Sequence, residues 1–141
     1  MSQALLAGIS RTTEPRTMLR RFLALDAVVT GGNGLAYLTL SGPLGRLLGI
    51  DSALLLELGV FLSLYAAGVG VLAARRRPPV LGVKLVVDVN VAWALLSVVA
   101  LLTVLEPTTA GAFWVPMQAM TVAGFAALQW SALRGTTTAT A

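Results

Sequence analysis

The chain has 141 residues, 57% of them hydrophobic and only 11% charged, with a mean hydropathy of +0.84. Soluble domains carry roughly 25% charged residues, so the composition predicts an integral membrane protein with room for about four or five helical spans. Cysteine and histidine are absent, which excludes disulfides, Cys/His zinc sites and histidine-based catalysis.

Four apolar segments follow a polar N-terminal arm, predicted to be disordered over residues 1–18. Each is near or above the length that crosses hydrocarbon as a helix. Turn-forming residues separate them, a short Thr/Ala tail follows from residue 135, and Asp51 or Ser52 and Thr108 or Thr109 are placed to cap helices. The segments cover about 22–40, 53–74, 80–105 and 110–133. The predicted fold class is an all-α membrane protein, a four-helix transmembrane bundle.

Basic residues predict the orientation of these spans. The net charge of +4 comes mostly from arginines before the first span, between the second and third, and after the fourth, whereas only Arg46 lies on the other side. The protein is expected in the plasma membrane. By the positive-inside rule, both termini and the 75–79 loop are expected on its cytoplasmic side. The same clusters indicate contact with the lipid bilayer and not with nucleic acid.

The first span carries polar residues on one face. Asp26, Thr30, Asn33 and Tyr37 follow a spacing of four, three and four residues, which keeps them in line on a helix. This stripe is expected to face other helices or a wet cavity. Thr30 and Asn33 have two interpretations, as hydrogen-bond partners of a neighbouring helix or as part of a proton or solute site headed by Asp26.

A second aspartate, Asp88, lies in the third span one turn after Lys84. That spacing favours an ion pair, and Lys84 is close enough to the boundary to snorkel to the interface. Asp26 has no basic residue one turn before it, so its partner is expected from another helix, water or a bound proton. Lys84 is a candidate partner for both aspartates if the first and third spans touch, and together these residues complete the proton or solute site.

The surroundings of the two aspartates are similar in sequence. The stretch 23–29 aligns with 85–91, matching Asp26 with Asp88. Both halves would start and finish on the same side, so a true duplication predicts two helical hairpins related as a parallel repeat. Chance similarity between aliphatic segments is the alternative.

Small residues at four-residue spacing predict where helices pack closely. One ladder lies in the second span and one in the fourth, and one can serve the packing within the chain while the other serves a homodimer or a membrane-protein partner. Trp93 is expected in the core or in a pocket wall, and Gln118 and Gln129 share a face of the fourth span. The ladder residues are Ala66, Gly70 and Ala74, and Ala119, Ala123, Ala127 and Ser131.

The stretch 25–37, with Asn90-Val91-Ala92-Trp93 in the second half, resembles uncharacterised small four-span integral membrane proteins of actinobacteria. This resemblance implies a fold and a location, but no activity. In size and span count the chain also resembles the small multidrug resistance transporters and the DoxX-like proteins. In the former family the glutamate of the first helix lies at a different depth from Asp26.

Two functional classes follow from the sequence. The first is an accessory or structural membrane protein that associates through its helix faces. The second is a small, proton-coupled and dimeric transporter that uses Asp26. No metal ligand set, cofactor motif or nucleophile–base pair is present in the sequence, so no catalytic residue, metal or cofactor is predicted and an enzyme is not expected.

Overall fold

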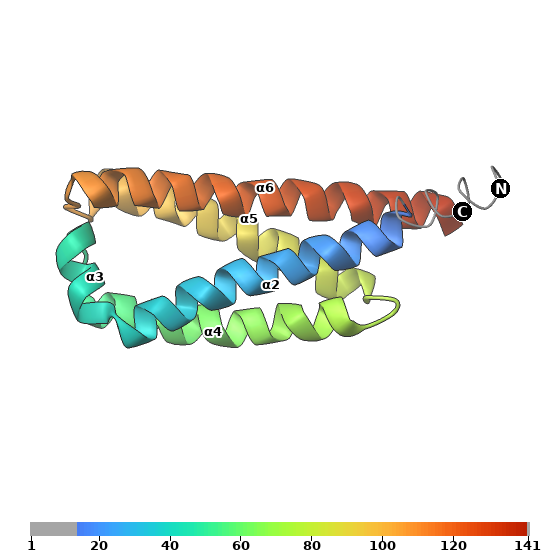
Figure 1. Ribbon diagram of the computed structural model, residues 1–141. Helices are drawn as coiled ribbons and strands as arrows, with labels where there is room; N and C mark the ends of the chain where they lie inside the picture. Colours follow the sequence, from blue (N-terminus) through green and yellow to red (C-terminus); the bar gives the residue numbers. More distant parts are fainter. Residues whose placement is uncertain (1–13, 141) are drawn as a thin grey trace, which may run out of the picture.

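The computed structural model describes residues 14–140, with side chains up to Thr136, and within this part the chain is helical and has no strands (Figure 1). Four long helices lie side by side: α2 (Pro15–Thr39), α4 (Ser52–Ala74), α5 (Val80–Thr103) and α6 (Thr109–Thr140). A short helix, α3 (Ser41–Leu48), follows α2 after a bend of 100° and crosses one end of this arrangement. The described part of the chain is therefore all-α.

Three of these helices, α4, α5 and α6, are long and apolar enough to cross a membrane. The bent pair formed by α2 and α3 would make a fourth span if it crosses as one unit. These lengths and compositions are those of a membrane protein.

The helices differ from the predicted segments in three places. The predicted arm reaches residue 18, but α2 already begins at Pro15, because proline is well accommodated in the first turn of a helix; residues 1–13 lie outside the described part. The loop predicted between the first two spans contains α3. The tail predicted from residue 135 is helical as far as Thr140, since no proline follows Arg134 to stop α6.

Pairs of helices pack unequally. α2 packs against α4 and α6, and α5 packs against α6, whereas α4 and α5 touch little although a short loop joins them. α2 and α4 come closest where Gly34 faces Gly59: a Cβ added to Gly34 would lie 2.8 Å from the backbone nitrogen of Ser63, and one added to Gly59 would lie 2.9 Å from that of Leu38. Glycine therefore permits this backbone contact.

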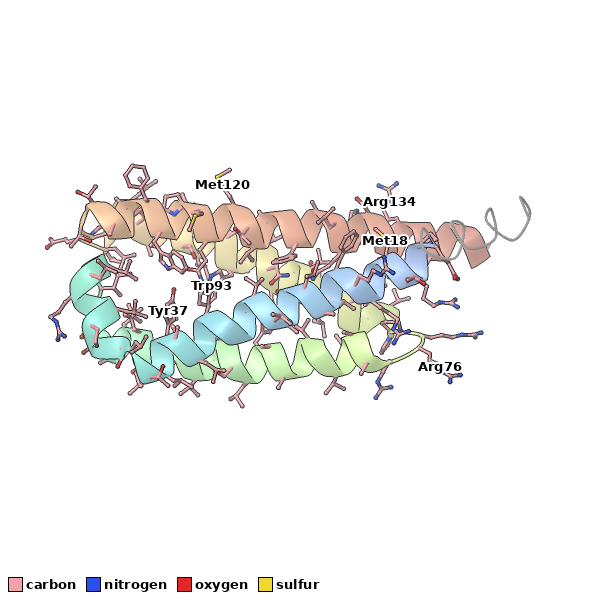
Figure 2. The ribbon with its side chains drawn as sticks, viewed as in Figure 1. Met18, Tyr37, Arg76, Trp93, Met120 and Arg134 are labelled. Carbon is pink, nitrogen blue, oxygen red and sulfur yellow. The ribbon has the colours of Figure 1, made fainter. Side chains whose placement is uncertain are left out.

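Most of the described basic side chains lie at one end of the molecule. The first residues of α2 lie there, and Figure 2 shows Arg76 and Arg134 at this end, far from Tyr37. Arg20 connects α2 to α4 at the same end, because its Nε donates a hydrogen bond to the carbonyl of Ala73, in the last turn of α4, at 3.1 Å. The structure thus separates a basic end from the end closed by α3.

The opposite end is held by contacts between α3 and the loop before α6. Gly49 ends α3 in the left-handed conformation, with φ of 70°, which favours glycine. The amide of Thr108 then donates to the carbonyl of Leu48 at 3.1 Å, and its hydroxyl donates to the carbonyl of Leu47. Asp51, predicted as a cap, is confirmed at the start of α4, where it accepts from the amide of Ala53.

Candidate functional site

A buried polar network lies at the centre of the packed helices, around Asp26. The side chains of Asp26 and Gln129 are 0% exposed, those of Asn90 and Thr30 3% and 7%. Oδ2 of Asp26 accepts from Nε2 of Gln129 at 2.7 Å and from Nδ2 of Asn90 at 2.8 Å, and Oδ1 accepts from the hydroxyl of Thr30 at 2.9 Å. Both carboxylate oxygens therefore have donors from the chain.

The network continues through Asn90 to a fourth helix. Nδ2 of Asn90 also donates to Oε1 of Gln129 at 3.1 Å. The hydroxyl of Tyr65 lies 3.1 Å from Oδ1 of Asn90 and 3.1 Å from the carbonyl of Val86, so its single proton has two acceptors. The five side chains come from α2, α4, α5 and α6, so this one network connects all four long helices.

A smaller polar cluster lies nearer to α3. The hydroxyl of Tyr37 accepts from Nε1 of Trp114 at 2.8 Å and donates to Oε1 of Gln118 at 3.3 Å. It joins α2 to α6 two helical turns beyond the Asp26 network, counted along α2 from Thr30. Tyr37 is almost fully buried, and the apolar side chains of Leu55 and Leu62 pack around it.

Two cavities lie between these polar groups. The smaller, of about 120 Å³, is lined by Thr30, Tyr65 and Asn90 of the network and by Asn33. The larger, of about 380 Å³, is lined by Tyr37 and by apolar residues of α4 and α5. Trp93, Trp114 and Gln118 line both cavities, which therefore adjoin. We call the two together the interhelical cavity.

The residues predicted as a proton or solute site are thus divided. Asp26 and Thr30 belong to the network, and Thr30, Asn33 and Tyr37 line the interhelical cavity. Lys84 and Asp88 are both exposed on the outer surface of α5, and within the described residues neither forms an ion pair with the other or with Asp26. Their side chains point away from the network because Asn90 occupies the inward face of α5 at this level.

The two small-residue ladders are also used differently. On α4, Ala66 approaches Gly31 of α2 and Gly70 approaches Ala27, whereas Ala74 is exposed at the end of the helix. On α6, Ala119 is buried, but Ala123, Ala127 and Ser131 are exposed. Within one chain, therefore, the α4 ladder packs against α2 and most of the α6 ladder is uncovered.

The sequence pattern does not reveal two members of the network. It places Asn90 on a different face from Asp88 without suggesting a role, and it does not single out Tyr65. The usable signal is that polar side chains inside apolar spans seek one another: Asn90 and Gln129 are amides of the third and fourth spans, which makes both of them candidates to contact Asp26. Trp93, expected in the core or a pocket wall, is in the cavity wall.

No group of three or more acidic, histidine or cysteine side chains within residues 14–136 is arranged to hold a metal ion. No protein-family model matches the chain, and neither a curated protein nor a solved structure matches it. The resemblance to four-span proteins of actinobacteria stays a prediction.

Proposed function

We propose that this chain is a multi-pass protein of the plasma membrane, a four-helix transmembrane bundle with both termini in the cytoplasm, and that it acts as an accessory or structural component. In this role it associates with a second copy or with another membrane protein. The orientation is supported by the basic end described above, because cytoplasmic loops carry the excess of arginine and lysine.

The observation that carries the proposal is the position of Asp88. It lies eight residues into α5, about 12 Å along the helix axis, in the middle of the exposed face. Leu81 and Leu95, seven residues before and after it, are also exposed. An aspartate inside a span is costly in lipid, by up to about 2.5–3.5 kcal/mol at the centre. Contact with a protein partner would remove Asp88 from lipid.

The α6 ladder supports the same role. Ala123 and Ala127 are exposed, and a Cβ added to the neighbouring Gly124 would meet nothing within 4 Å. Small side chains let a second helix approach closely. Since α2 covers the corresponding ladder on α4, the α6 face is the one left for a partner.

The proposal is tested by cross-linking in native membranes, with differently tagged copies expressed together. Wild-type protein should be recovered in a cross-linked complex, and Asp88→Leu should reduce that yield severalfold while the monomer stays folded, because Asp88 makes no hydrogen bond within the described chain. Glu57→Leu is the matched control, an exposed carboxylate on α4. Recovery of wild type as a lone monomer would contradict the proposal.

A second candidate function is a small transporter in which Asp26 binds a proton or a cationic solute. It is favoured by Thr30, which donates to Asp26 and also lines the interhelical cavity, so this side chain connects the carboxylate to a space that can hold a solute. The complete set of donors around Asp26 suits a structural role equally well. For that reason the accessory role is the main proposal.

The transporter candidate predicts flux of a lipophilic cation, with tetraphenylphosphonium as the probe, driven by a pH gradient across proteoliposomes. Asp26→Asn should abolish this flux because it removes the charge from the site. Thr136→Val, a change near the end of α6 outside the network, is the control. Undiminished flux in Asp26→Asn would remove Asp26 from the proposed mechanism.

A further inference from the structure

The walls of the interhelical cavity are uncharged, and those of its larger part are mostly apolar. The larger part is lined by leucine, isoleucine, valine and alanine side chains, together with Tyr37, Trp93, Ser97, Trp114 and Gln118. No acidic or basic side chain among the described residues lines either part. Cavities of a few hundred Å³ with apolar walls and a small number of polar groups are typical of small-molecule sites. An uncharged ligand fits this lining better than an ion.

One buried polar atom in the wall has no partner. Nε1 of Trp93 is buried and makes no hydrogen bond within the described chain. Figure 2 shows Trp93 and Tyr37 in the same part of the molecule, and both side chains line the larger cavity. A buried donor without an acceptor is unfavourable, because it has lost its hydrogen bonds to water and has gained none in the protein. Nε1 does not face the open space of the cavity, so a ligand with a carbonyl, ether or hydroxyl oxygen would supply the missing acceptor once the indole turns toward it.

The cavity lies beside the end of the molecule that α3 crosses, and it approaches the surface at the side of the bundle. α3 crosses that end, and Leu44 and Ile50 pack against the cluster around Tyr37. At the side, α4 and α5 touch little, and Phe61 fills the space between them: it lines the smaller cavity, stacks on Trp93 at a centroid distance of 5.8 Å, and is 47% exposed. In a membrane this side faces lipid.

We propose that the interhelical cavity binds an uncharged, lipid-soluble molecule that carries a hydrogen-bond-accepting oxygen, and that this molecule enters from the bilayer between α4 and α5. Trp93 donates to the oxygen of the ligand, the leucines of α4 and α5 contact its apolar body, and Phe61 stands at the entrance. This site does not depend on the accessory role or on Asp26, because it involves neither Asp88 nor the charge of the carboxylate.

Benzophenone is a suitable probe, since it is neutral, lipid-soluble, carries one carbonyl oxygen and forms adducts with nearby C–H bonds under light. The full chain in lipid nanodiscs is irradiated at increasing benzophenone concentration, and adducts are mapped by mass spectrometry. Labelling should saturate at Leu55 and Val115, which line the cavity and are only 1% and 6% exposed. Met120, 76% exposed and outside the cavity, should be labelled without saturation.

Variants test the site itself. Ala100→Trp and Ser97→Phe each place a large side chain of α5 in the larger cavity and should each abolish saturable labelling. Two variants are used in case one fails to fold. Helix content and elution volume show whether each variant is folded. Ala92→Trp, exposed on α5 and outside the cavity, should leave labelling unchanged. Trp93→Phe should raise the half-saturating concentration roughly three- to tenfold, as expected for one lost hydrogen bond.

Two results would overturn the proposal. One is labelling of Leu55 and Val115 that rises in proportion to benzophenone without saturation. The other is saturable labelling that persists in a folded cavity-filling variant. Failure of the cross-linking experiment on Asp88 would not affect either readout, so the two proposals stand or fall separately.

Discussion

Asp26 and Asp88 show how far the surroundings of a residue decide its role. Both follow aliphatic residues in similar stretches, yet Asp26 is fully buried with three donors and Asp88 is exposed on the outside of α5. A buried carboxylate with donors from three helices fixes how those helices assemble, because any other packing would leave polar groups unpaired. Asp88, on the outer face of α5, has no hydrogen bond within the described chain and depends on the proposed partner for polar contacts.

The donors around Asp26 predict different effects of two substitutions. Asp26→Leu removes all three acceptor contacts and should lower the free energy of unfolding by about 1–3 kcal/mol. Asp26→Asn should cost clearly less, because its oxygen can face Asn90 and Gln129 while its amide donates to Thr30, whose hydroxyl can rotate and accept. The measurement is reversible unfolding in mixed detergent micelles, followed by helix circular dichroism.

Asp88→Asn is the matched control for the two Asp26 substitutions. It should change the free energy of unfolding by less than about 0.5 kcal/mol, as surface substitutions do. An Asp26→Asn variant as unstable as Asp26→Leu would show that the negative charge itself holds the helices together. The hydrogen bonds to Asp26 would then not account for its contribution to stability.

At the scale of the helices, the contact of α2 with α4 is set by glycine. A Cβ added to Gly34 would lie 2.7 Å from Oγ of Ser63 and 3.2 Å from the carbonyl oxygen of Gly59, and one added to Gly59 would lie 3.0 Å from the carbonyl oxygen of Gly34. Larger residues would hold the two helices apart and widen the space beside Tyr37 and Leu62, which pack in the same region. The close contact of α2 and α4 therefore also shapes one wall of the interhelical cavity.

This geometry predicts opposite effects of the same substitution at two positions of α2. Gly34→Ala places a methyl group 2.7 Å from Oγ of Ser63 and 2.8 Å from its backbone nitrogen, so the helices must separate and the free energy of unfolding should fall by about 1–3 kcal/mol. Gly32→Ala meets nothing within 4 Å and should be neutral or stabilising by up to about 1 kcal/mol. Equal effects of the two substitutions in the micelle unfolding experiment would contradict close packing at Gly34.

At the scale of the whole molecule, the lengths of the apolar segments predict the four long helices to within a few residues at most ends. The polar stripe of the first span correctly predicts that Asp26, Thr30 and Tyr37 face inward. The sequence does not predict which residues meet them, because Asn90 and Gln129 are separated from Asp26 by 64 and 103 positions and only helix packing brings them together. It misses α3 because eight residues with glycine and proline are typical of a loop.

The asymmetry of the two ends leads to a test of the proposed orientation. The chain has no cysteine, so single cysteines report on single positions. Ser52 and Ala74 are the first and last residues of α4, both are exposed, and 22 residues of helical rise separate them by about 33 Å, close to the thickness of the hydrocarbon core. Neither substitution changes a charge that sets the topology.

In intact cells, Ser52→Cys should react with a membrane-impermeant maleimide, and Ala74→Cys should react only after lysis, because the proposed orientation places the arginines beside Ala74 in the cytoplasm. The reverse pattern would mean that the whole molecule is inverted and that the basic end faces out. Reaction of both cysteines from the same side would show that α4 does not cross the membrane. The entrance between α4 and α5 would then face water instead of lipid, and the route proposed for the ligand would fail with it.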